Sequence, residues 1–155
     1  MQVDRRRVPR VLAVASGGGH WIQLLRLRPA LQGASVLFLT TREPSTREMQ
    51  GADYHLVPDG NMDSKGALIL SALHIGYRIV RFRPDVVIST GAAPGYIAIV
   101  FGKLLGARTI WIDSIANSEE LSLAGRKVRR WADHWLTQWP ELARPEGPFY
   151  VGAVL

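Results

Sequence analysis

The residues of this sequence best suited to chemistry form one glycine-rich segment near its N-terminus, Ser16-Gly17-Gly18-Gly19-His20. Glycines let a backbone approach a ligand closely, and the free N–H groups at the start of a helix attract anions. The segment lacks the G-x-G-x-x-G spacing of dinucleotide sites, and no Lys-Ser or Lys-Thr pair follows it as in a Walker loop. A plain tight turn is the alternative, but three consecutive glycines exceed what a turn requires. We therefore interpret this segment as an anion-binding loop of another type.

His20 is the residue of this loop that is suited to proton transfer. It would lie in the first turn of the following helix, where the positive end of the helix dipole disfavours an imidazolium. A neutral imidazole can accept a proton, so His20 is a candidate base. A structural role for this histidine is the alternative.

Two later segments also place small or polar residues at the end of a predicted strand. The first leads into a helix, so it is either a second anion site or a place of close helix–strand packing. Its candidate ligand-binding residues are Thr90, Gly91, Ala92 and Gly95. The second begins with Asp113 and Ser114, which are candidates for ligand contact. No metal-ligand spacing occurs, because the four histidines are scattered and cysteine is absent. The G-x-S-x-G elbow of a serine hydrolase is absent as well.

The elements that must position these segments alternate between strand and helix. Short apolar runs predict strands over residues 10–15, 35–40, 53–57, 86–89, 108–112, 134–138 and 149–151. Helices are predicted over residues 21–31, 43–50, 64–81, 94–105 and 123–132, the third with a break near Gly76. This order indicates an α/β fold, a single Rossmann-like, doubly wound parallel sheet that fills residues 1–155 after a basic segment, 1–9. Ligands bind beyond the carboxyl ends of such strands, so the three candidate segments should meet there.

The composition is basic, with 19 Lys and Arg against 13 Asp and Glu, and a net charge of +6. Arginine suits oxyanions because its planar guanidinium binds them with two hydrogen bonds. The basic residues cluster at positions 5–10, 78–83 and 126–130, a pattern that anionic lipid headgroups, nucleic acid or lipid phosphates would each explain. No nucleic-acid-binding module is recognisable. The absence of cysteine excludes a secreted disulfide scaffold, and no apolar stretch is long enough to span a membrane.

Four segments resemble a known family of glycosyltransferase subunits. They are ASGGGH at 15–20, STGAAPGY at 89–96, WIDSIANSEELSLAGR at 111–126 and ADHWLTQWPEL at 132–142. In this order they resemble the acceptor subunits of bacterial exopolysaccharide glycosyltransferases of the PssD type and the eukaryotic Alg-fourteen family. They are more distantly similar to the N-terminal half of MurG, a single-chain GT-B transferase. The resemblance implies the N-terminal half of a GT-B fold.

The resemblance also implies roles for particular residues. Gly18, Gly19 and His20 match the end of the GGTGGH loop of MurG, so the loop would face the diphosphate of a polyprenyl-diphosphate-linked acceptor. Ala15-Ser16 replaces the first two glycines of that loop. The segment from Thr90 to Gly95 corresponds to the second glycine-rich loop of MurG. Asp113, Ser114 and Asn117 fall where MurG has its HEQN segment, although the histidine is not kept.

A split enzyme would need a partner and a membrane. A PssE-like donor-binding chain would hold the UDP-sugar, so no cofactor is expected on this chain, and PssD-type relatives suggest glucuronic acid as the sugar. We expect peripheral docking at the cytoplasmic face of a bacterial inner membrane through Arg5, Arg6, Arg7, Arg10 and Trp21. The sequence stops after Val151 to Leu155, where a GT-B chain would cross to its second domain.

Two alternatives stay open. One is a non-catalytic scaffold that recruits the donor-binding subunit to the membrane and presents the acceptor. The other is a free-standing nucleotide-binding protein. The second is disfavoured because Thr40-Thr41-Arg42 offers no acidic residue to a ribose at the end of the second strand.

Overall fold

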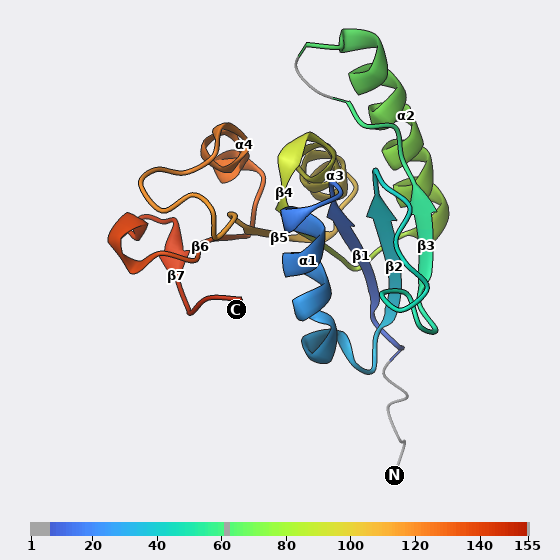
Figure 1. The fold of residues 1–155 in the computed structure, drawn as a ribbon, viewed down its shortest axis with the longest axis horizontal. Coiled ribbons are helices and arrows are strands. Elements are labelled where there is room, and N and C mark those ends of the chain that lie inside the picture. The colour runs from blue at the N-terminus through green and yellow to red at the C-terminus, as the bar shows by residue number, and fades with distance from the viewer. Residues whose placement is uncertain (1–6, 61–62, 155) are drawn as a thin grey trace.

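A computed structural model describes residues 7–60 and 63–154, whose arrangement is shown in Figure 1. The alternating pattern folds as predicted into one sheet of seven parallel strands, in the order β3-β2-β1-β4-β5-β6-β7. The strands are β1 (Arg10–Ala15), β2 (Ser35–Thr40), β3 (Asp53–Leu56), β4 (Val86–Gly91), β5 (Arg108–Ile112), β6 (His134–Thr137) and β7 (Phe149–Tyr150).

The order of the strands reverses at the middle of the sheet. From β1 the chain proceeds through β2 to β3 on one side, and then returns to β4 on the other side of β1. Open parallel sheets bind ligands at such a switch point, beyond the carboxyl ends of the strands. The glycine-rich loop follows β1, and the segment from Thr90 to Gly95 spans the end of β4 and the start of the next helix. The topology therefore places them side by side.

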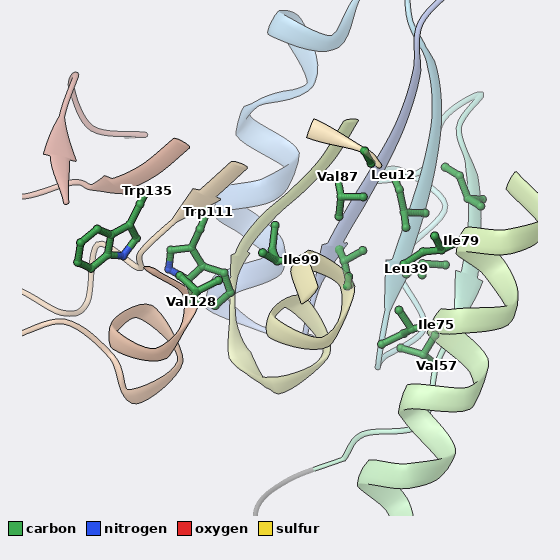
Figure 2. Packing of buried hydrophobic residues seen from close by; sticks show 14 residues of the cluster. Leu12, Leu39, Val57, Ile75, Ile79, Val87, Ile99, Trp111, Val128 and Trp135 are labelled. Atoms are coloured by element: carbon green, nitrogen blue, oxygen red, sulfur yellow. The ribbon is translucent and has the colours of Figure 1, made fainter. Parts of the chain in front are cut away.

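Helices cover both faces of the sheet. On one face lies α1 (Gly19–Arg26), whose Trp21 and Leu24 belong to a core with Phe38 of β2. The opposite face is covered by α2 (Lys65–Phe82) and α3 (Ala92–Leu104), and Figure 2 shows Ile79 of α2 beside Leu39 and Ile99 of α3 near Val87. The shorter segments are α4 (Leu123–Lys127) and the 3-10 helices η1 (Arg28–Leu31), η2 (Val128–Arg130) and η3 (Pro140–Leu142).

The predicted helix over residues 43–50 is wrong, because this segment forms only turns. Ser45 and Glu48 bond each other as at a helix start: the Ser45 N–H donates to Glu48 Oε2 (2.6 Å), and the Glu48 N–H donates to Ser45 Oγ (3.3 Å). The segment then reaches Gly51, whose φ of 70° lies in the left-handed region. The helical conformation therefore stops after a single turn.

Other helices differ from the prediction in extent or continuity, and α3 begins two residues before the predicted Pro94. The helix predicted over 21–31 ends at Arg26 and continues as η1, where Pro29 has no N–H to donate. The helix predicted over 123–132 is α4 followed by η2. In contrast, α2 is unbroken at Gly76. A Cβ there would lie 3.3 Å from the Phe101 ring, so this glycine allows close packing of α2 against α3.

Candidate functional site

The glycine-rich loop lies between β1 and α1, as the sequence predicts. Gly18 is the N-cap residue of α1 and has φ 85°, a conformation that glycine adopts without strain. The Gly17 N–H donates to Thr41 Oγ1 over 3.0 Å, which ties the loop to the end of β2. A Cβ on Gly17 would lie 2.7 Å from Cβ of Arg42, so the missing side chain lets Arg42 pack against the loop. The loop thus brings a guanidinium to the start of α1.

His20 lies in the first turn of α1 and is held by the end of β4. Its Nδ1 lies 3.0 Å from the carbonyl oxygen of Thr90, and Thr90 Oγ1 donates to the carbonyl oxygen of His20 over 2.6 Å. Because a carbonyl can only accept, Nδ1 carries the proton, and Nε2 of a neutral ring is free to accept one. A Cβ on Gly91 would overlap the ring at Nδ1, so glycine at this position makes room for the imidazole. The arrangement orients one ring nitrogen as a base.

An apolar pocket of about 480 Å³ opens beside His20. It lies between the start of α3, the N-terminal part of α2 and α4. Ser114 and Asn117 contribute polar groups to it. Its other lining residues are Leu68, Ala92, Ala93, Tyr96, Ile97, Ala116, Ser122, Leu123, Ala124 and Lys127. The pocket suits a ligand that is mostly hydrocarbon and has a polar end near His20.

A polar pocket of about 350 Å³ lies on the other side of the first turn of α3. It is lined by Ser16, Gly17, Thr41, Arg42, Asp59, Gly60, Ala92, Ala93 and Pro94. Ala92 and Ala93 line both pockets, so the two meet at the start of α3. Ala92 has φ 67°, a left-handed conformation that is uncommon for a residue with a side chain. Residues in such conformations cluster at functional sites. Backbone N–H groups at the start of α3 and the Arg42 guanidinium make this junction suitable for an anion.

Asp113 organises the third loop and does not line either pocket. It is 1% exposed, and its carboxylate accepts hydrogen bonds from Trp111 Nε1, Asn117 Nδ2 and both the N–H and Oγ of Ser122, at 2.6–3.1 Å. The loop therefore folds around this side chain. Asn117, which the Asp113 carboxylate holds, and the neighbouring Ser114 are the residues of this loop start that reach the pocket.

Replacing Asp113 with Asn should therefore destabilise the fold and loosen the loop. The amide places an NH₂ group where one carboxylate oxygen now accepts two hydrogen bonds. The buried NH₂ would then face N–H or O–H groups that also donate. We expect a loss of about 2–4 kcal/mol in the free energy of unfolding, measured by chemical denaturation. Glu119→Gln makes the same charge change on an exposed residue of the same loop and should cost less than about 0.5 kcal/mol. Equal effects of the two variants would contradict the assigned role.

Other predicted site residues support the site without lining it. Gly95 is buried, and a Cβ there would overlap Ser89 Oγ, so its absence permits packing of α3 on β4. Thr90 and Gly91 lie at the end of β4 and position His20. Gly18 and Gly19 are exposed at the start of α1. Of the candidate ligand-binding residues, Ser16, Gly17, Ala92, Ser114 and Asn117 line the pockets.

The predicted membrane-contact residues do not form one surface near the site. Trp21 is 4% exposed and packs edge-on against Phe38, with 5.8 Å between ring centroids, so the expectation of an interfacial Trp21 is wrong. Arg7 pairs with Asp85, and the Arg10 N–H donates to the same carboxylate over 2.8 Å. The Arg10 N–H is the largest influence that lowers the pKa of Asp85.

These two arginines lie at the amino end of β1, opposite the glycine-rich loop, as Figure 1 shows for the start of that strand. Because they lie at the opposite edge of the sheet, they cannot bring the glycine-rich loop to the surface of a bilayer. Arg5 and Arg6 lie outside the described residues. No helix in the described part of the chain is both long and apolar enough to cross a membrane.

Two buried glutamines connect the loops, and neither is among the site residues predicted from the sequence. Gln23 Nε2 donates to Ser114 Oγ (3.1 Å) and to the Gly19 carbonyl (3.3 Å), while Gln23 Oε1 accepts from the Ile115 N–H (3.1 Å). Gln138 Nε2 donates to Gln23 Oε1 over 2.6 Å. The sequence feature that could have identified Gln23 is its position three residues after His20, which places both on the same side of the helix. Arg42, Leu68 and Lys127 were missed because no motif contains them.

Comparison with known proteins agrees with this geometry. A family model described as "Oligosaccharide biosynthesis protein Alg14 like" matches residues 56–154. The chain is 25% identical to "UDP-N-acetylglucosamine transferase subunit ALG14" of Mus musculus, over 90% of this chain and 80% of that protein. The Homo sapiens protein of the same name is also 25% identical, over 92% and 81% of the two chains.

Solved structures show the same fold. The structure of Acinetobacter baumannii MurG superimposes with a TM-score of 0.73 at 16% identity, over 94% of this chain and 45% of that one. A UDP-N-acetylglucosamine 2-epimerase superimposes with a TM-score of 0.65 at 11% identity, over 86% and 42%. The chain thus spans less than half the length of these structures and has the fold of an N-terminal GT-B domain. By the family match, which covers well over half of its residues, this chain belongs to the Alg14-like family of oligosaccharide biosynthesis proteins.

Proposed function

We propose that this chain is the acceptor-binding subunit of a two-component glycosyltransferase. The enzyme would move a sugar from a UDP-sugar to a polyprenyl-diphosphate-linked saccharide. The observation that carries this proposal is the junction of an apolar and a polar pocket beside a histidine whose Nδ1 is fixed. An acceptor with a lipid, a diphosphate and a sugar hydroxyl has the three chemical parts that these features suit.

The three parts of the acceptor would occupy different parts of the site. The lipid would enter the apolar pocket past Leu68. The diphosphate would lie at the junction of the pockets, near Arg42 and the starts of α1 and α3, where N–H groups and the helix dipoles favour anions. The saccharide would then extend over the exposed glycines of the loop towards the donor. This placement leaves the nucleotide to a partner chain.

In the proposed mechanism His20 acts as the general base. Its Nε2 takes the proton of the acceptor hydroxyl while that oxygen bonds to the anomeric carbon of the donor. The bond between this carbon and the UDP oxygen breaks, and UDP leaves with the electron pair. Holding donor and acceptor in line across two domains supplies much of the acceleration in such reactions.

The identity of the sugar is a further part of the proposal. The matched relatives are named UDP-N-acetylglucosamine transferase subunits, which favours N-acetylglucosamine over the glucuronic acid suggested by PssD-type proteins. The deciding experiment combines this chain with a PssE-like partner and a synthetic polyprenyl-diphosphate acceptor, and supplies UDP-N-acetylglucosamine or UDP-glucuronic acid. Transfer should require both chains. Full activity of this chain alone, or tight UDP-sugar binding by it, would contradict the split enzyme.

An apolar stripe on α2 is the surface that we propose meets the membrane. It consists of Ile69, Leu70, Leu73, Tyr77 and Val80, which are 48–66% exposed. Steps of three and four residues bring them to one side of the helix. Leu68, the residue before this stripe, lines the apolar pocket, so a lipid leaving the pocket would reach the stripe directly. We therefore infer peripheral binding at the cytoplasmic face of a bacterial inner membrane through α2.

Replacing both Leu73 and Tyr77 with Glu should remove vesicle binding. Burying each such side chain contributes about 1.5–3 kcal/mol, so we expect partitioning to fall at least about tenfold. Ile22→Glu is the control, since Ile22 is 50% exposed on α1, at the opposite face of the sheet. Cosedimentation with phospholipid vesicles measures both variants. A loss as large for Ile22→Glu as for the α2 variant would overturn this assignment.

A further inference from the structure

A third recess lies on the other side of α2, away from His20. This basic groove has a volume of about 390 Å³ and runs between the edge strand β3 and the C-terminal half of α2. Its charged and titratable lining residues are Arg10, Asp53, His55, Arg78 and Arg81, from three different elements, beside Leu37, Tyr54 and Phe82. None of these residues lines the apolar or the polar pocket. The groove is therefore a separate site.

The lining of the groove carries more positive than negative charge. Three guanidinium groups line it, against the single carboxylate of Asp53. Among residues 7–60 and 63–154, no side-chain oxygen pairs with the guanidinium of Arg10, Arg78 or Arg81. In comparison, the exposed Arg126 pairs with Glu120 over 2.9 Å. Unpaired guanidinium groups that face one recess are suited to an oxyanion.

Aromatic rings hold two of these arginines in place. The Arg10 guanidinium lies 4.7 Å from the centroid of the Phe82 ring, and that of Arg78 lies 5.6 Å from the centroid of the Tyr77 ring. A ring contact restrains the guanidinium plane while its N–H groups stay available for hydrogen bonds. Burial, and then the charge of Arg78, lower the pKa of His55, while the carboxylate of Asp53 acts in the opposite direction. The site is thus preorganised for negative charge.

The groove borders the apolar stripe of α2. Arg81 is four residues after Tyr77, so the two side chains are neighbours on the helix surface, and Arg78 lies beyond them on the groove side. A phospholipid has the matching arrangement of an anionic phosphate next to hydrocarbon. Its acyl chains would follow the exposed stripe while its phosphate reaches the recess. A soluble phosphate would use only the recess.

We propose that the basic groove binds the phosphate of an anionic phospholipid headgroup. This inference rests on the proposed contact of α2 with a membrane, but not on transferase activity. It adds lipid selectivity to that contact: the apolar stripe supplies affinity for any bilayer, and the groove supplies preference for an anionic one.

The first test compares two double variants that each remove two positive charges. Arg78→Gln with Arg81→Gln alters the groove, and Arg129→Gln with Arg130→Gln alters an exposed basic segment elsewhere. Partitioning is measured on vesicles of phosphatidylcholine alone and on vesicles that also contain phosphatidylglycerol. We expect the groove variant to lose about ten- to thirtyfold of the binding gained from phosphatidylglycerol, since each basic residue near an anionic surface contributes about a factor of five. The control should lose less than about threefold.

The outcomes separate this inference from the proposed function. Equal losses in the two double variants would overturn the groove site and indicate diffuse attraction, while leaving the membrane contact of α2 intact. A wild-type chain that ignores both kinds of vesicle would overturn the membrane contact and the groove site together. Thermal unfolding of each variant checks that the fold is kept.

The second test distinguishes a lipid headgroup from free phosphate. The imidazole signals of His55 are followed by NMR, with His55→Asn used to assign them among the four histidines. Short-chain dihexanoyl phosphatidylglycerol should shift these signals at a concentration at least about tenfold lower than inorganic phosphate does, because its chains contact the stripe as well. Equal response to both ligands, or no response to either, would overturn the headgroup assignment.

Discussion

Replacing His20 with Asn should lower turnover by the proposed two-chain enzyme about 10²–10⁴-fold, the usual contribution of a general base. The expectation follows from the two ring nitrogens. Asn retains a donor near the position of Nδ1, which now bonds the Thr90 carbonyl at 3.0 Å, but it has nothing in place of Nε2. Acceptor binding should therefore change less than about threefold, because the loop and both pockets stay formed. Steady-state kinetics with a synthetic acceptor gives kcat and KM separately.

Two companion results make this test decisive for the role of His20. Thr90→Val removes the hydroxyl that donates to the His20 carbonyl but keeps the Thr90 carbonyl, so kcat should fall less than about tenfold. An enzyme with His20→Asn and unchanged kcat would leave the chain as a scaffold that presents the acceptor. A large rise in KM with the same kcat would assign His20 to binding of the diphosphate.

Replacing Gly91 with Ala should abolish most activity through the same histidine. Gly91 has φ 139°, a conformation open almost only to glycine, and a Cβ there would overlap His20 Nδ1. The methyl group must displace the ring or the end of β4. We expect a loss of at least about 10²-fold in kcat from the displaced base, and about 2–4 kcal/mol in the free energy of unfolding from strain and overpacking.

Gly33→Ala is the matched control for this prediction. Gly33 also has a positive φ, 84°, but a Cβ there would meet nothing within 4 Å. This variant should lose about 1 kcal/mol of stability from backbone strain and keep its activity. Kinetics and denaturation on both variants separate strain from steric displacement. Normal activity of Gly91→Ala would show that the position of the His20 ring does not matter to the reaction.

The strands were the most predictable part of the fold. The runs Arg10–Ala15, Ser35–Thr40 and Arg108–Ile112 begin and end as the apolar pattern predicts, because a strand that helices cover on both faces is apolar at most of its positions. The segment 43–50 shows the opposite case. Its polar sequence forms a helix-like start, but Met49 alone among its residues is buried, so packing does not extend the helix.

The sequence predicts which loops meet at the site, but it does not predict the full set of residues that line the pockets. Alternation of strands and helices places His20, Ser114 and Asn117 at one edge of the sheet, and the structure brings them to one recess. Arg42 and Leu68 reach the recesses from elements that no motif links to the loop. The place of Arg10 could have been inferred, since the first residue of a strand lies at the edge opposite its last. The burial of Trp21 could have been inferred as well, because Trp21, Leu24 and Leu25 recur at steps of three and four residues and so form the apolar face that a helix packs on a sheet.

The paired glutamines have a consequence for how the site can move. Gln138 uses its whole amide: Nε2 donates to Gln23 Oε1 and to the Asp113 carbonyl, and Oε1 accepts from the Val154 N–H over 2.7 Å. Gln23 in turn bonds to Ser114 and to the Gly19 carbonyl. Four stretches of chain that are distant in sequence are thereby fastened to each other by two side chains that are nearly sealed from water. These hydrogen bonds thus connect the loops on either side of His20 with the segment at Val154, so we expect a displacement of that segment to shift the turn that carries the histidine.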